Sequence, residues 1–290
     1  MNKDEINKKI SEIENDMIQA DFWQNKDSAQ EKIKNLGELK DQLSGFGKYD
    51  KGSAIVTIFS GVGGDDAEDW SRMLLEMYMG YVDKNGYKIN FIDENKNPNG
   101  GYRSVTFEIA GKAAYKNLKN ESGVHRLVRI SPFNSNGKRQ TSFSMVEVIP
   151  KMEKTDKEVE ISDEEIEIEY TKSSGPGGQN VNKRETAVRI VHKESGLSVL
   201  SSNQRSQAQN KEQALEILKG KLYNLKKEQD EKKEAGMSVS KNTSAEWGSQ
   251  IRSYVLHPYQ MVKDHRTNTE TSNIQAVLGG EIDLFIESMR

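Results

Sequence analysis

The segment SSGPGGQNVNKRE at residues 173–185 restricts the fold of this chain more than any other stretch. It places Gly177 and Gly178 side by side between two segments that alternate in the manner of strands. Glycine has no Cβ and adopts backbone angles that other residues avoid, so a ligand can approach such a backbone closely. We therefore expect a loop that projects from a small sheet and meets a ligand through its main chain.

The side chains of this loop limit the chemistry that it can support. Gln179 is not a general base, because an amide has no useful pKa near neutrality. Its N–H, positioned by two glycines, can instead stabilise an oxyanion, and its side chain can orient a water molecule. Asn182, Lys183 and Arg184 can bind a phosphate backbone. These groups do not make a complete active site, so we expect a partner to supply the rest.

Two hydrophobic periods divide the rest of the chain into helices and strands. Residues 1–47 have the apolar spacing of a helix, and a second helix is expected after the GVGGDD turn, with Asp65 or Asp66 as its N-cap. Short apolar or alternating segments predict strands at 54–59, 87–93, 102–109, 144–150 and 165–170, followed by a hairpin at 187–202. The spacing of four leucines predicts a long helix at about 209–233. The mixture predicts an α+β fold with several domains.

Composition excludes several classes of protein. The 290 residues contain no cysteine, which excludes a thiol nucleophile and cysteine-ligated zinc. The four histidines lack metal-binding spacing, and neither a signal peptide nor an apolar run near ~18 residues is present. We therefore expect a cytoplasmic protein with no metal, no cofactor and no membrane partner.

The GVGGDD turn has the position of a phosphate-binding loop, between a strand and a helix. Its sequence, however, matches neither the P-loop nor the dinucleotide-binding motif, and its two aspartates would repel a phosphate.

The net charge of -3 conceals an uneven distribution. Residues 147–170 carry 3 basic against 10 acidic residues, whereas residues 171–229 carry 11 basic against 5 acidic. Residues 123–144 carry four basic residues and no acidic one. Two basic segments in an acidic chain indicate two separate contacts with a polyanion, although such runs also occur as solvated surface.

Three motifs resemble the bacterial class I peptide chain release factors. SGPGGQNVNK looks like the GGQ loop of that family, and VHRLVRISPFNSNGKRQTSF at 124–143 resembles the codon-reading segment of its release factor 2 group. WGSQIRSYV at 247–255 resembles the switch region that senses the decoding centre. The resemblance implies translation termination at UGA and UAA: the factor reads the codon and promotes hydrolysis of peptidyl-tRNA together with ribosomal RNA, rather than acting as an enzyme alone.

The resemblance also implies roles for individual residues. Gly177, Gly178 and Gln179 would act at the peptidyl ester, and Gln179 would be N5-methylated by a glutamine methyltransferase. Ribosomal RNA would be contacted by Lys183, Arg184 and Arg205. The switch region would include Trp247, Gln250 and Arg252. Stop-codon recognition falls to Ser131, Pro132, Phe133, Gly64, Asp66, Arg129, Gln140 and Thr141.

Three features depart from the family pattern. The family usually has Thr-Glu where this chain has Asp65-Asp66, and histidine where it has Gln140. The N-terminal helical domain is also shorter, and the missing part is the one that contacts the ribosomal stalk and the release-factor GTPase in relatives.

The expected domains are 1–50 (N-terminal helices), 51–160 (α/β codon recognition), 161–235 (GGQ domain with a hairpin and long helix) and 236–290 (switch region and a C-terminal segment packed on the codon domain). The expected partners are the 70S-type ribosome, the stop codon and P-site peptidyl-tRNA, bound by a monomer. The alternatives are a ribosome-rescue hydrolase that reads no codon, release factor 1, an RNA-binding scaffold with an inactive loop, and a plain α/β protein with a flexible loop.

Overall fold

The computed structural model describes residues 3–18, 49–152, 161–172, 185–234 and 250–289, with single positions between 29 and 47. The predictions for Gly177, Gly178, Gln179, Lys183, Arg184 and Trp247 concern residues outside these ranges. Within them, no helix combines the length and the apolar character needed to cross a membrane.

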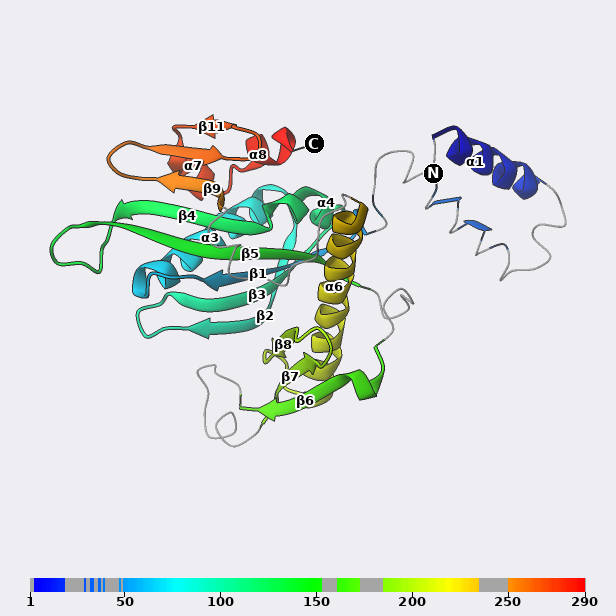
Figure 1. The fold of residues 1–290 in the computed structure, drawn as a ribbon, viewed down its shortest axis with the longest axis horizontal. Coiled ribbons are helices and arrows are strands. Elements are labelled where there is room, and N and C mark those ends of the chain that lie inside the picture. The colour runs from blue at the N-terminus through cyan, green and yellow to red at the C-terminus, as the bar shows by residue number, and fades with distance from the viewer. Residues whose placement is uncertain are drawn as a thin grey trace.

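The larger part of the described chain is one sheet of eight strands in the order β11-β10-β9-β4-β5-β1-β3-β2 (Figure 1). Neighbouring strands are antiparallel except β4 and β9, which run parallel. The strands are β1 Ala54–Ser60, β2 Lys88–Lys96, β3 Tyr102–Ala110, β4 Gly123–Ile130, β5 Arg139–Pro150, β9 Gln250–Val255, β10 Met261–Asp264 and β11 Glu270–Thr271. The strands predicted at 54–59, 87–93, 102–109 and 144–150 are confirmed.

Helix α3, Asp65–Lys84, covers one face of this sheet. Its apolar stripe, which includes Trp70, Leu74 and Tyr78, is fully buried against the strands. The short helices α4 Ala114–Leu118, η2 Lys119–Glu121, α7 Ile274–Leu278 and α8 Asp283–Ser288 complete this side of the core.

The N-cap prediction for α3 is wrong. The chain enters the helix through Gly63 and Gly64, whose φ angles are 145° and 58°, and Gly64 occupies the N-cap position. Asp65 and Asp66 consequently lie in the first turn of the helix. Carboxylates are favourable there because the helix N-terminus carries partial positive charge.

A second unit holds the small sheet of β6 Ile166–Thr171, β7 Ala187–His192 and β8 Ser198–Ser201, preceded by η3 Asp163–Glu165. Helix α6, Gln207–Glu234, packs Ile217 and Leu218 on this sheet and continues onto the large one (Figure 1). There Lys221 Nζ lies 2.7 Å from Glu147 Oε2 on β5. The predicted hairpin and long helix are confirmed.

Helix α1, Lys3–Ile18, begins the described chain. Ile10 is buried with Leu36, and Ile13 and Met17 pack against the same cluster. The helical spacing predicted for this segment is confirmed at these three positions of α1, whereas the side chain of Ile6 lies outside the description.

Candidate nucleic-acid interface

The end of the large sheet where β4 leads into β5 meets the N-terminus of α3. The Gly61 N–H donates to the Phe143 carbonyl at 2.8 Å, which holds the GVGGDD turn against β5. A Cβ on Gly63 would lie 3.1 Å from Ala67 Cβ, so the turn is tight as well as left-handed. Glycine is therefore required at Gly63 for both conformation and space.

Asp66 connects this turn to the residues predicted to read the codon. The Ser131 hydroxyl donates to Asp66 Oδ2 at 2.6 Å, and Arg129 Nη2 donates to Asp66 Oδ1 at 3.2 Å. The same Arg129 nitrogen lies 2.6 Å from Asp69 Oδ2. The Phe133 N–H donates to the Ser131 hydroxyl at 3.1 Å. Residues far apart in sequence thus form one hydrogen-bonded group, which we call the Asp66 cluster (Asp66, Asp69, Arg129 and Ser131).

The residues at this end of the sheet differ in their exposure to solvent. Ser131 is only 3% exposed, whereas Phe133 is 44% exposed on the loop that follows β4. Pro132 and Gly64 are also exposed. The loop therefore presents its apolar ring to solvent while the serine hydroxyl is held below it. The prediction from sequence missed Asp69, although its position one helical turn after Asp66 could have indicated it.

The strand register separates Gln140 from Thr141. Arg129 pairs with Gln140, and Val128 pairs with Thr141, without a bulge between them. Because successive side chains of a strand point to opposite faces, Gln140 shares the α3 face with Arg129 while Thr141 projects from the other face. Both side chains are exposed. The structure thus brings Gln140, but not the Thr141 side chain, onto the face of the Asp66 cluster.

Arg252 is buried within the protein. Its guanidinium donates to Glu121 Oε2 at 2.8 Å and Oε1 at 2.7 Å, and to Asp264 Oδ2 at 3.1 Å. It also lies over the Phe285 ring at 4.2 Å. A side chain with no exposed surface makes no RNA contact in this conformation, so Arg252 anchors β9 from within. Gln250, at the start of β9, is half-buried beside Val124.

The groups around Arg252 have shifted pKa values. Burial would raise the pKa of Glu121, but the charge of Arg252 outweighs it and the net shift is downward. Burial lowers the pKa of His125 to about 4. Its Nε2 lies 3.1 Å from the Glu121 carbonyl, which can only accept, so Nε2 carries the proton and Nδ1 accepts from the Tyr254 hydroxyl at 3.2 Å. His125 is therefore a neutral, satisfied member of the cluster.

Arg205 lies at the base of the glycine-rich loop. The loop leaves the small sheet at Thr171 and returns at Ala187, which pair with each other. The Asn210 side chain donates to the Thr186 carbonyl at 2.7 Å, which ties the start of α6 to this end of the sheet. Arg205, exposed just before α6, is therefore near the points where the loop begins and ends.

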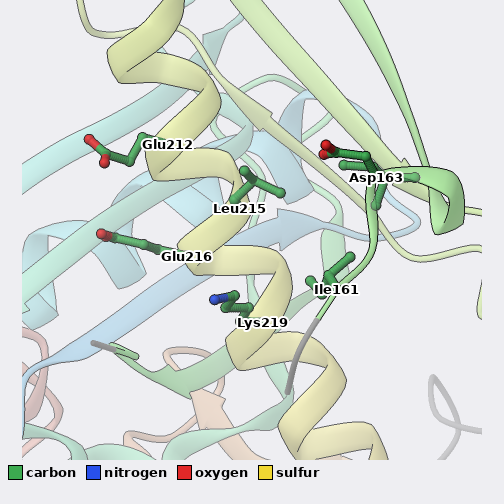
Figure 2. Close-up of a pocket in the computed structure, with 7 residues that line it drawn as sticks. Ile161, Asp163, Glu212, Leu215, Glu216 and Lys219 are labelled. Atoms are coloured by element: carbon green, nitrogen blue, oxygen red, sulfur yellow. The ribbon is translucent and has the colours of Figure 1, made fainter. Parts of the chain in front are cut away.

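A shallow pocket of about 200 Å³ lies between α6 and the chain that enters β6 (Figure 2). Its lining combines apolar side chains with charges of both signs: Ile161, Asp163, Ile166, Glu212, Leu215, Glu216 and Lys219. In the part of the chain that the structure describes, no group of three acidic or histidine residues could hold a metal ion.

The sequence matches two family models, the PCRF domain at residues 2–146 and the RF-1 domain at residues 153–266. Peptide chain release factor 2 of Clostridium perfringens (strain SM101 / Type A) is 49% identical over 253 residues, 87% of this chain and 69% of the relative. The protein of that name from Staphylococcus haemolyticus is 45% identical, covering 93% of this chain and 72% of the relative. RF2 of Thermus thermophilus, a solved structure, superposes with a TM-score of 0.73 and 41% identity, covering 91% of this chain and 74% of that one.

A relative named peptide chain release factor 2 from Thermotoga maritima aligns over 336 positions and 99% of this chain. The alignment is longer than the 290 residues here, so that relative has residues that this chain lacks. Similarity of this extent in both domains and in the fold leads to one conclusion: the chain belongs to the peptide chain release factor 2 family of translation termination factors.

Proposed function

We propose that this protein reads UGA and UAA codons in the ribosomal A site and promotes hydrolysis of the peptidyl-tRNA ester together with ribosomal RNA. The observation that carries the proposal is the Asp66 cluster, in which Ser131 Oγ lies 2.6 Å from Asp66 at the exposed end of the sheet. The protein acts as a monomer in the cytoplasm.

Codon reading uses hydrogen-bonding groups whose donors and acceptors can rearrange. The Ser131 hydroxyl is both donor and acceptor, so it can pair with guanine or adenine at the second position once a base replaces its bond to Asp66. Gly64 and Asp66, at the N-terminus of α3, contact the first uridine. Thr141, which projects from the face of β5 opposite to Gln140, contacts the third base.

Ester hydrolysis uses the loop between β6 and β7. Gly177 and Gly178 allow close approach to the ester, and the Gln179 N–H stabilises the tetrahedral species or the leaving hydroxyl. Lys183, Arg184 and Arg205 bind ribosomal RNA at the base of this loop. Gln179 is the substrate of a glutamine methyltransferase.

Codon reading belongs to residues 51–160 together with residues 236–290, of which β9–β11 continue the same sheet. Residues 161–235 form the hydrolysis domain, and residues 1–50 form the N-terminal domain. Trp247 and Gln250 in the switch region face the decoding centre. Arg252 is buried and anchors β9 instead of contacting RNA.

The test is peptide release from purified ribosomes that carry labelled peptidyl-tRNA and UAA, UGA, UAG or a sense codon in the A site. Wild type is expected to release peptide on UAA and UGA alone. Gly178→Ala should abolish release without loss of codon-dependent binding, because an added methyl group blocks approach to the ester. Ser131→Ala should raise KM about tenfold, as expected for loss of a base contact.

Ser135→Ala is the matched control, because Ser135 is exposed on the same loop, and its KM should equal that of wild type. Release that ignores the codon, or that occurs only on empty A sites, would identify a rescue hydrolase instead. Codon-dependent binding without release by wild type would show that the glycine loop is inactive.

A further inference from the structure

The turn LHPYQ at residues 256–260 projects beside the codon-reading loop. Strand β9 runs parallel to β4 with Val255 beside Val128, and the Leu256 N–H donates to the Val128 carbonyl at 2.8 Å. The β9–β10 turn and the loop at 131–138 therefore leave the sheet at the same end (Figure 1). The turn flanks β4 on the side away from β5.

Exposed apolar side chains gather at this end of the sheet. Of the ten large hydrophobic residues exposed in the described chain, four lie in segments that meet here: Val62, Ile130, Phe133 and Tyr259. Tyr259 is 56% exposed, more than Phe133 at 44%. Phe133 is among the residues expected to recognise the stop codon, whereas Tyr259 has been assigned no role.

The charges around the turn suit an RNA partner. Neither 256–260 nor 131–138 contains an acidic residue, although the chain contains 45. On the strands behind the turn, Asp264 is bound by Arg252 and Arg266, and Glu270 lies 3.4 Å from Lys263. These two carboxylates are therefore paired with cations, so they oppose a phosphate backbone less than free carboxylates would.

The base of the turn is held by several interactions. Val255 pairs with Met261 directly below it, and the Ser253 hydroxyl lies 2.8 Å from His265 Nε2 across the two strands. Arg252 fixes the same strand to Glu121. An aromatic ring on a fixed base loses little conformational freedom when it binds, which favours stacking.

We propose that Tyr259 stacks on an unpaired nucleobase next to the stop codon. The inference rests on the proposed function, since it requires the codon-reading end of the sheet to face the A site. The base belongs either to the messenger RNA beside the codon or to small-subunit ribosomal RNA. Stacking tolerates every base because each has a π-face, so the surface adds affinity rather than codon choice.

The test compares Tyr259→Ala and Tyr259→Phe with wild type in peptide release on UGA-programmed ribosomes. Leu284→Ala, which truncates a 50% exposed side chain on α8, is the matched control. Tyr259→Ala should raise KM by about 5- to 150-fold at unchanged kcat, because stacking contributes to binding and not to ester hydrolysis. Tyr259→Phe and Leu284→Ala should behave like wild type.

Messenger RNAs with an abasic site on either side of the codon distinguish the two sources. If the base is in the messenger, the abasic site removes the difference between wild type and Tyr259→Ala; if it is in ribosomal RNA, the difference persists. If wild type is active and Tyr259→Ala has the same KM, the stacking proposal is refuted and the release function stands. An inactive wild type would refute the release function, and binding of the same variants to programmed ribosomes would then decide on stacking.

Discussion

Replacing Arg252 by methionine should destabilise the protein through one identifiable group. The guanidinium makes two short bonds to Glu121, at 2.7 and 2.8 Å, and two longer ones to Asp264, at 3.1 and 3.3 Å. Asp264 keeps Arg266, whose Nη2 lies 2.8 Å away. Glu121 keeps only the Tyr78 hydroxyl at 3.2 Å among the side-chain bonds of the described chain. The substitution thus leaves Glu121 as a buried charge without a cation.

The cost follows from that uncompensated charge. Breaking a buried ion pair by removing one partner costs about 3–5 kcal/mol. Urea unfolding followed by tryptophan fluorescence measures it, because Trp70 is fully buried and packs edge-on against Tyr254 at 4.9 Å. Adding Glu121→Gln to Arg252→Met should recover about half of the loss, because it removes the stranded charge.

Acid provides a second check on the same reasoning. Burial without Arg252 should raise the pKa of Glu121 above its ordinary 4.5, so the folded variant takes up a proton as pH falls. A carboxyl whose folded pKa is raised gains stability on acidification, so the difference between variant and wild type should shrink from pH 7.5 to pH 5. A loss below about 1 kcal/mol, or a double variant no more stable than Arg252→Met, would contradict this account.

Three further predictions concern other parts of the structure. Wild type should lose up to about 3 kcal/mol of stability as pH falls from 6.5 to 4, because unfolded His125 protonates while the folded residue, with a pKa of about 4, stays neutral; urea titrations across this range measure it. Gly80→Ala should cost about 1–3 kcal/mol in thermal unfolding, since its Cβ would lie 2.6 Å from the Gly279 carbonyl, whereas Met79→Ala should cost less. Gln140→His should lower KM on stop-codon-programmed ribosomes about fivefold in release assays, because imidazole stacks on a base and an amide does not.

Local patterns were sufficient to predict most elements of the fold. The apolar run at 54–59 predicted β1, which is buried on both faces, and the alternation at 102–109 predicted β3, whose Val105, Phe107 and Ile109 face the core. The apolar stripe that includes Trp70 and Tyr78 predicted α3, because its residues recur at the helical period and are buried on one side of the helix. The start of α3 was misplaced because the positive φ of Gly64, and not a side-chain cap, determines it.

Non-local pairing could not be predicted in the same way. The parallel placement of β9 beside β4 depends on residues about 130 positions apart in sequence, and no local period encodes it. Glu121 and Asp264 are buried around Arg252, although they lie about 143 positions apart in sequence. A single buried arginine in a short strand gives no sequence signal until its partners are known.

The parallel pairing of β9 with β4 joins the end of β4 near Ser131 to the strand of the predicted switch region. Val128 pairs with Val255 near one end of this ladder, close to Ser131, and Val124 pairs with Gln250 at the other, so all of β9 lies within the expected switch region at 247–255. His125 and Arg252 pair between them and are held by Glu121. A displacement of β4 at the codon therefore moves β9 with it, because the buried charges resist any separation of the two strands. Loosening this ladder with Arg252→Met should make release less dependent on the codon, in addition to lowering stability.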